Sequence, residues 1–455
     1  MLRSACRALS SRQRKVLALD GAELTRLINS MADASPKRAP PWRWELPELP
    51  LYYTLVGLYF FAFGMQFVLY PSLVAFSLEA TPTGVGLAQS ALSAPMFCFL
   101  LFGGLLAERA KAGPTLAKLH LAFAFASIAL CMIVSAGALT YPILIGYAIL
   151  VGGCAAFLMP VRDAALNGVV MREGARGRHT PMATAAATTT AVQIGAQIGG
   201  ILLARFAGAD PAPFLAIQAL VLGVGAAVAL LLQAPKPTGH EHTVAGAIHD
   251  MLDGLRYSFR NPIMSPMLIS AAYVGVFIIG SFQVLFPLIV RDAYGGDAQT
   301  QAARLGALFA TFWGASFVSA VILSRLKPLK YPGRALIASH LISALALFTF
   351  AVHKPFMWFV AIVVLWGLAA GVAISMSRTI TQGAADRQYL GRVLAVYSMG
   401  FMGGAPIGSA LVGFAAGELG PRIAALIPAT GLALAVIALA AATPLWRYVG
   451  ARAEP

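Results

Sequence analysis

The chain has 455 residues, of which 59% are hydrophobic and 11% are charged. Because soluble domains carry about 25% charged residues, this composition excludes an ordinary soluble protein and indicates a chain that folds in lipid. Lys and Arg number 33 against 18 Asp and Glu, a net charge of +15. The four cysteines form no CxxC pair and three of them lie in apolar runs, which excludes a disulfide scaffold.

The apolar residues gather in segments of about 20, the length that a helix needs to cross a bilayer. Runs such as 144–151 do not alternate apolar and polar residues, which excludes a transmembrane barrel. The segments therefore predict an all-α integral membrane protein with 12 transmembrane helices. The predicted spans are 52–78, 84–106, 115–137, 140–160, 182–204, 212–233, 264–290, 303–325, 334–352, 356–377, 391–416 and 422–446.

One long polar break, 234–262, separates the first six spans from the last six. Pro235 and Pro237 at its start are typical of a linker, and apolar residues at helical spacing from Val244 to Phe259 predict an amphipathic helix. Matching landmarks in the two sets of spans favour two pseudo-symmetric six-helix bundles. The predicted organisation is a basic tail at 1–50, an N-terminal bundle at 51–233, a cytoplasmic linker at 234–262, a C-terminal bundle at 263–446 and a tail at 447–455.

Positive charge is concentrated on one side of the predicted membrane. When loops alternate between the two sides, one side receives only five of the 33 basic residues: Arg205, Arg291, Arg304, Lys354 and Arg422. Since Lys and Arg accumulate in cytoplasmic loops, we expect a multi-pass protein of the bacterial cytoplasmic (inner) membrane with both termini in the cytoplasm. Basic residues spread over many loops also exclude a nucleic-acid partner.

The first 30 residues are basic, rich in serine and poor in acids. Three interpretations stay open for them. They form a disordered or interfacial basic tail, they are a targeting segment that resembles a mitochondrial transit peptide, or they precede a true start at Met31. The bacterial character of the remaining chain favours the first and the third.

The connection between spans two and three ends a helix with Glu108 and Arg109. Such charges can pair with neighbouring helix ends in one conformation and release them in another, or they can simply anchor the cytoplasmic side. The connection resembles the G-x-L-A-[DE]-R-x-G-[RK] loop of the major facilitator superfamily, although Lys111 stands where glycine is usual. The matching residues are Gly104, Leu106, Ala107, Glu108 and Arg109.

Further stretches carry the same resemblance. Span five resembles the G-x-x-x-G-P-x-x-G-G pattern of antiporter branches at Gly195, Gly199 and Gly200, with alanines at the first glycine and the proline. Small residues at this spacing let helices approach closely. The stretches 160–166, 254–262 and 390–408 resemble the drug and siderophore exporter branch, which includes the enterobactin exporter.

The resemblance implies alternating access, in which two six-helix halves rock about a central binding cavity near the midplane. It also implies proton-driven export. The residues expected to serve the gate are Gly104, Glu108, Arg109, Arg162, Asp163, Gly195, Gly199, Gly200, Arg378, Arg392, Gly404, Pro406 and Gly408.

The spans themselves contain almost no ionisable side chain, which leaves proton coupling open because intramembrane carboxylates are the usual proton relays. Span four, ended at residue 160, lacks the embedded arginine associated with proton antiport. His120 and His340, early in spans three and nine, are able to titrate, but packing roles are the commoner use of such histidines.

Polar and aromatic residues within the spans are the candidates for lining a cavity. Thr189, Gln193 and Gln197 share one face of span five, although each glutamine is also suited to an interhelical hydrogen bond. An uncharged aromatic and amide-rich cavity suits a bulky amphipathic or neutral solute. The full set is Tyr59, Gln66, Gln89, Thr189, Gln193, Gln197, Tyr273, Gln283, Trp313, Trp366 and Tyr397.

The sequence predicts a secondary active exporter of small amphipathic or neutral molecules, acting as a monomer in the lipid bilayer. An importer of the same fold and a non-transporting membrane scaffold or sensor are the alternatives. Nucleophile-elbow, HExxH and phosphate-loop motifs are missing, so no enzyme and no cofactor is expected. His240, Glu241, His242 and His249 follow a Pro-rich linker and are interpreted as a solvated loop, with no metal site.

Overall fold

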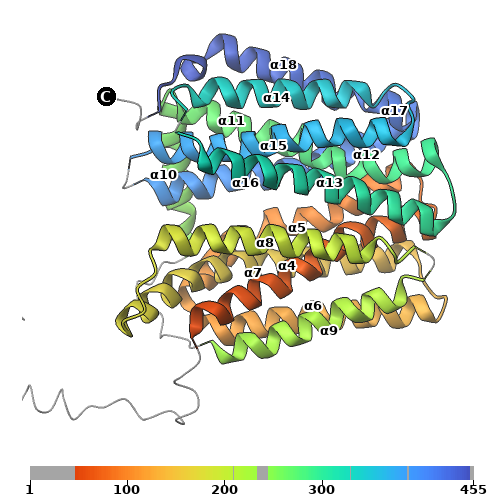
Figure 1. The fold of residues 1–455 in the computed structure, drawn as a ribbon, viewed down its shortest axis with the longest axis horizontal. Coiled ribbons are helices and arrows are strands. Elements are labelled where there is room, and N and C mark those ends of the chain that lie inside the picture. The colour runs from red at the N-terminus through yellow and green to blue at the C-terminus, as the bar shows by residue number, and fades with distance from the viewer. Residues whose placement is uncertain (1–46, 209, 233–243, 328, 387–388, 451–455) are drawn as a thin grey trace, which may run out of the picture. The chain divides into compact units, whose positions relative to one another are not determined.

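The computed structural model describes residues 47–208, 210–232, 244–327, 329–386 and 389–450. Residues 1–46 of the predicted basic tail, with Met31, and His240, Glu241 and His242 of the linker lie outside the described residues. Every regular element in the described ranges is a helix (Figure 1). The first half of the chain forms α4 (Glu48–Ser72), η2 (Leu73–Ser77), α5 (Pro82–Arg109), α6 (Ala112–Ser135), α7 (Tyr141–Ala175), α8 (Met182–Ala204) and α9 (Ala212–Leu231).

The second half begins with a helix in the predicted linker, α10 (Val244–Arg260). Asn261 follows it and starts the next helix, because its Oδ1 accepts the backbone N–H groups of Ile263 (2.9 Å) and Met264 (3.1 Å). The remaining elements are α11 (Met264–Val274), η3 (Gly275–Ile279), α12 (Gly280–Ile289), η4 (Val290–Tyr294), α13 (Ala298–Arg325), α14 (Pro332–Thr349), α15 (Phe356–Ala384), α16 (Leu390–Leu419), α17 (Pro421–Ala424), α18 (Leu426–Ala442) and η5 (Pro444–Arg447).

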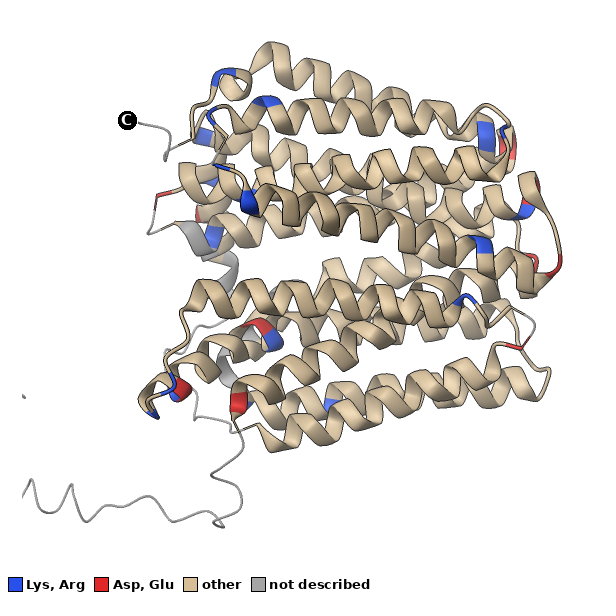
Figure 2. Cartoon of the chain, viewed as in Figure 1, with Lys and Arg blue, Asp and Glu red and all other residues tan. Residues whose placement is uncertain are grey.

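Eleven helices of the described ranges are long and apolar enough to cross a membrane, judged by length and composition. They coincide with eleven of the predicted spans, and α5, which covers the second predicted span, is not among them. The structure is therefore that of an all-helical membrane protein, and the predicted count of twelve is not confirmed. Charged residues lie toward the two ends of the helices, and uncharged residues fill most of the length between (Figure 2).

The helices pack in two groups that follow the chain order (Figure 1). In the first group, α4 packs on α8 and α9, α5 on α7, and α6 on α9. In the second group, α15 packs on α13 and α14, α18 on α14, and α16 on α11, η3 and α12. We call the end that carries the α7–α8 connection and α10 the predicted cytoplasmic end, and the opposite end the predicted outer end.

The fourth predicted span is longer than expected. The sequence interpretation ended it at residue 160, but α7 continues through Pro160 to Ala175, and Gly177 with φ of 80° follows its end. A proline removes one intrahelical hydrogen bond, and here an apolar face that includes Leu166 and Val169 continues the packing beyond it. The expected loop residues Arg162 and Asp163 therefore lie inside a helix.

Candidate functional site

A cavity lies between the two helix groups, about midway along their helices. Its lining comes from α4, α5 and α7 of the first group and from α12 and α13 of the second. The volume is about 90 Å³, below the roughly 300 Å³ at which sites for drug-sized ligands begin. Every lining residue is uncharged: Phe63, Gln66, Phe67, Pro71, Gln89, Leu92, Ser93, Met96, Val151, Gly152, Ala155, Gln283 and Phe309.

Three of the glutamines singled out in the sequence meet in this cavity. Gln66 on α4 and Gln89 on α5 face it from the first group, and Gln283 on α12 faces it from the second. Phe67 and Phe309 close the wall from opposite groups, with ring centroids 5.5 Å apart. The cavity thus combines amide groups with aromatic surface, an arrangement suited to an uncharged ring compound with polar substituents.

Gln66 belongs to a buried hydrogen-bond network within the first group. Its Oε1 accepts from the hydroxyl of Tyr147 (2.8 Å) and from Nε2 of Gln218 (3.1 Å). Gln218 also donates to the carbonyl of Ala62 (2.9 Å) and accepts from the hydroxyl of Ser127 (3.2 Å). Sequence reasoning missed Gln218, because a single glutamine in an apolar run gives no indication of its partners.

The other predicted cavity residues are not among those that line this cavity. Gln197 packs its backbone on Gly64 of α4, and the hydroxyl of Thr189 is bonded to the carbonyl of Ala185 within α8 (2.8 Å). Trp366 is fully buried among phenylalanines of the second group. Trp313 packs on the rings of Phe67 and Phe312. Gln193 and Tyr397 are partly buried, while Tyr59 and Tyr273 each pack on a histidine.

The two groups approach each other closely where α5 crosses α16. A Cβ added to Gly413 would lie 2.5 Å from Cα of Gly86, so neither position has room for a side chain. Further along the same crossing the hydroxyl of Ser90 donates to the carbonyl of Pro406 (2.7 Å). These contacts join the groups between the cavity and the predicted outer end.

The predicted outer end carries a further bridge between the groups. Arg291 of η4 donates from Nη1 to the carbonyl of Ala80 (2.7 Å), which precedes α5. Gly306 of α13 packs against Cβ of Arg205, just after α8. Both contacts join the two groups at this end in the conformation described.

A family model described as transmembrane secretion effector matches residues 65–448. The chain belongs to this family of the major facilitator superfamily. It is similar to the enterobactin exporter EntS of Shigella flexneri, 26% identical over 360 residues that cover 78% of this chain and 81% of the exporter. It is also similar to EntS of Escherichia coli O139:H28, strain E24377A / ETEC, 25% identical over 358 residues with 78% and 81% coverage.

Solved structures share the fold of this major facilitator chain. The nucleoside transporter NupG superposes with a TM-score of 0.68 at 14% identity, covering 89% of this chain and 100% of NupG. A bacterial homolog of the human lysosomal transporter Spinster, in an inward-facing and unoccupied conformation, gives 0.62 at 14% identity, with 90% and 97% coverage. The family makes this chain a multi-pass secondary transporter rather than an enzyme.

The glycines expected to serve the gate of this transporter pack within each group. Gly200 of α8 lies against the carbonyl of Phe61. A Cβ added at Gly199 would lie 3.5 Å from the ring of Phe61. Gly404 and Gly408 of α16 lie against the backbone of span seven around Val276. Gly195 and Gly104 meet nothing within 4 Å. Glycines that do pack between the groups include Gly86, Gly413 and Gly306, which sequence reasoning did not select.

Arg162, which was expected in the loop after span four, lies within the helix. Its side chain is buried inside α7, with the guanidinium 4.9 Å from the ring centroid of Phe60 and bonded to the neighbouring Asp163 (2.6 Å). Its Nη1 has no hydrogen-bond partner among the described residues. Sequence reasoning placed Arg162 in a loop because Pro160 was taken as the end of the helix.

The remaining motif residues of the transporter lie at the predicted cytoplasmic end. Glu108 and Arg109 form the last residues of α5, and their side chains lie outside the described atoms. Arg378 is exposed on α15. Arg392 packs its Cβ against Gly254 of α10, and its Nη1 lies 3.9 Å from Asp253, so the 254–262 and 390–408 stretches meet.

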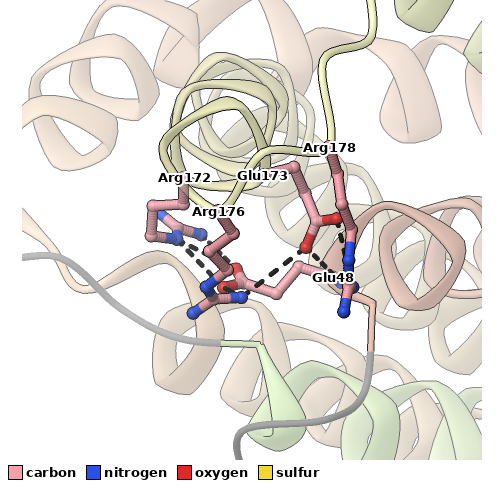
Figure 3. Close-up of polar contacts among 5 residues, drawn as sticks. All are labelled: Glu48, Arg172, Glu173, Arg176 and Arg178. Atoms are coloured by element: carbon pink, nitrogen blue, oxygen red, sulfur yellow. Dashed lines mark hydrogen bonds and ion pairs between the residues drawn. The ribbon is translucent and has the colours of Figure 1, made fainter.

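A buried ion network at the same end was missed. Glu48, at the start of α4, pairs with Arg172 (2.6 Å) and Arg176 (3.0 Å) near the end of α7 (Figure 3). Glu173 accepts the backbone N–H of Glu48 (3.0 Å) and pairs with Arg178 (3.4 Å). Both carboxylates are almost fully buried. The network joins α4 to the end of α7. Sequence reasoning missed it because Glu48 was assigned to the tail rather than to a helix.

Proposed function

We propose that the chain is a secondary active exporter that moves neutral or amphipathic aromatic molecules out of the bacterial cytoplasm as a monomer. The observation that carries the proposal is the uncharged cavity between the helix groups, with Gln66, Gln89 and Gln283 beside phenylalanine rings. Similarity to exporters of enterobactin, an assignment made for those relatives, supports the outward direction and a siderophore-like or drug-like solute.

The proposed mechanism is alternating access between two six-helix halves, 51–233 and 263–446. Contacts at Gly86, Gly413 and Arg291 support a state in which the cavity is shut toward the predicted outer side. Release would require these contacts to separate while the predicted cytoplasmic ends approach each other. The cavity volume is about 90 Å³, which is too small for a drug-sized solute. The proposed cycle therefore requires the cavity to widen in another conformation.

We also propose that export is coupled to protons, with buried ionisable side chains as the candidate proton carriers. Among the described residues, the candidate membrane-spanning helices hold five buried carboxylate, guanidinium or imidazole side chains: Glu48, His120, Arg162, Glu173 and His340. Uptake into inverted vesicles that depends on a pH gradient, and stops when an uncoupler collapses it, would support proton exchange. Uptake driven equally well without the gradient would rule it out.

Efflux from cells tests the exporter directly. We expect expression in a host stripped of its own pumps to lower the accumulation of aromatic drugs and to raise resistance to them. The Glu108→Gln and Arg109→Ala variants, at equal amounts of inserted protein, should lower accumulation and raise resistance much less than the wild type does. No change in accumulation across a broad panel would reject the exporter.

Two alternatives make different predictions. An importer of the same fold would concentrate the solute in right-side-out vesicles and not in inverted ones. A membrane scaffold or sensor would show no substrate-dependent closure, so cysteine pairs across the predicted outer ends would crosslink to the same extent with and without ligand.

A further inference from the structure

The orientation of the Gln66 amide is fixed by its neighbours. Gln218 lies 2.9 Å from the carbonyl of Ala62, which can only accept, so the atom that faces it is Nε2. The same nitrogen lies 3.1 Å from the Gln66 amide, so the Gln66 atom on that side is the oxygen. Tyr147 adds a second donor to this oxygen at 2.8 Å.

The consequence is a free donor on the other side of the Gln66 amide. Oε1 already accepts two hydrogen bonds, whereas Nε2 has no partner among the described residues. Gln66 is only 3% exposed and lines the cavity. A buried donor without a partner is unfavourable, so a ligand that supplies an acceptor lowers the free energy of the complex.

The surroundings narrow the chemistry of that ligand. Phe63 and Phe67 on α4 and Phe309 on α13 line the same cavity, and their faces favour an aromatic ring. No charged residue belongs to the lining, so an ion would lose its hydration without a partner.

We propose that Gln66 Nε2 donates a hydrogen bond to an acceptor oxygen of a neutral aromatic solute, and that Gln218 acts as a positioning residue. The hydroxyl of Ser127 donates to Oε1 of Gln218, and Nε2 of Gln218 donates to Oε1 of Gln66. This inference rests on the proposed function, because it names the class of substrate that the cavity selects: aryl ketones, aryl amides and similar compounds.

A matched pair of probes tests the donor. 1-Acetylnaphthalene and 1-ethylnaphthalene have nearly the same shape, and only the first carries an acceptor oxygen. Binding to the purified full-length protein is measured by quenching of tryptophan fluorescence. We expect the wild type to bind the ketone about tenfold more tightly than the hydrocarbon, the worth of one buried hydrogen bond.

Variants assign the preference to the network. Gln66→Met should abolish the difference between the probes, because the variant offers no donor to the ketone oxygen. Gln218→Met should reduce the difference several-fold, because Gln66 is then free to rotate, whereas a general loss of structure would weaken both probes equally. The control is Gln301→Met, since this amide bonds the carbonyl of Gly296 (2.9 Å) at the predicted outer end.

Equal affinity of the wild type for the two probes, or no detectable binding of the ketone, would overturn the inference without any variant. A preference that survives in Gln66→Met would overturn it as well. Failure of the proposed function looks different. Discrimination by the purified protein without efflux of any compound in cells would leave the donor site standing and reject the exporter.

Discussion

The hydroxyl of Tyr273 lies 2.6 Å from Nδ1 of His340, where α11 faces α14 in the second helix group. The first group contains a similar pair in Tyr59 and His120, with ring centroids 5.7 Å apart. There the hydrogen bond is not made, because neither Tyr59 Oη nor His120 Nε2 has a partner among the described residues. The two pairs thus share residue types and differ in bonding.

The two histidines also end the same short pattern, Gly-x-x-Leu-x-x-x-His-Leu, which starts at Gly113 in α6 and at Gly333 in α14. Each glycine packs on the backbone just after a late helix of its group, Gly113 after α9 and Gly333 on η5 after α18. A Cβ at Gly113 would lie 2.9 Å from the carbonyl of Leu232, and one at Gly333 would overlap the carbonyl of Leu445. Equal spacing and equal surroundings support the proposed pseudo-symmetry better than the weak sequence likeness of the spans.

The tyrosine pairs give a prediction with its own control. Tyr273→Phe removes the partner of a buried imidazole and should destabilise the protein by about 1–3 kcal/mol. Tyr59→Phe removes a hydroxyl that has no partner, so it should be neutral or slightly stabilising. Thermal unfolding in detergent compares the two variants. Equal losses in both would show that the hydrogen bond between Tyr273 and His340 contributes nothing.

The crossing of α5 and α16 predicts a strong effect of a single methyl group. Gly413→Ala places a Cβ within 2.5 Å of Cα of Gly86, so the helices must separate and both stability and efflux should fall. Gly146→Ala is the control, since a Cβ there meets nothing within 4 Å and alanine favours the helix by about 1 kcal/mol. Unchanged melting and efflux in Gly413→Ala would contradict a tight crossing.

The positions of the helices were largely predictable because a bilayer requires long apolar segments, and such segments are visible without knowledge of the packing. Errors arose where tertiary contacts decide. Residues after Pro160 stay helical because Leu166 and Val169 are buried. Glu48 was placed in the tail because its partners, Arg172 and Arg176, lie far away in the sequence.

The candidate site was predictable in part for a similar reason. Gln66, Gln89 and Gln283 stood out as polar residues inside apolar spans, and the structure brings them to one cavity. Gly86 and Gly413 did not stand out, since a glycine that meets another helix looks the same in sequence as one that faces lipid. Gln218 was missed because hydrogen-bond partners on other helices cannot be read from spacing along one helix.

Glu48 should contribute to stability through its two arginines. Glu48→Gln keeps the volume and removes the charge that Arg172 and Arg176 share. Because both arginines are partly exposed, we expect a loss of about 1–2 kcal/mol rather than the larger cost of a fully buried pair. Asp292→Asn is the control, since it breaks the exposed pair with Arg291 and should cost about 0.5 kcal/mol or less. Similar melting temperatures for Glu48→Gln and wild type would show that the network does not stabilise the packing of α4 on α7.

Arg291 should hold the predicted outer side closed. Its Nη1 bonds the carbonyl of Ala80 in the other helix group (2.7 Å), whereas Arg304 bonds the carbonyls of Tyr294 (2.9 Å) and Gly295 (2.8 Å) within its own group. Arg291→Ala should therefore shift the protein toward the state open on that side, and Arg304→Ala should not. A lost charge-assisted hydrogen bond of about 1.5 kcal/mol corresponds to a shift of roughly tenfold in the two populations.

Reaction of a cavity thiol reports this shift. Gln283→Cys, in a chain whose native cysteines are replaced, places a thiol in the cavity lining. A membrane-impermeant maleimide added outside intact cells should label it several-fold faster when Arg291→Ala is also present, and at the unmodified rate with Arg304→Ala. Equal labelling with either arginine replaced would mean that the bond to Ala80 does not control access to the cavity.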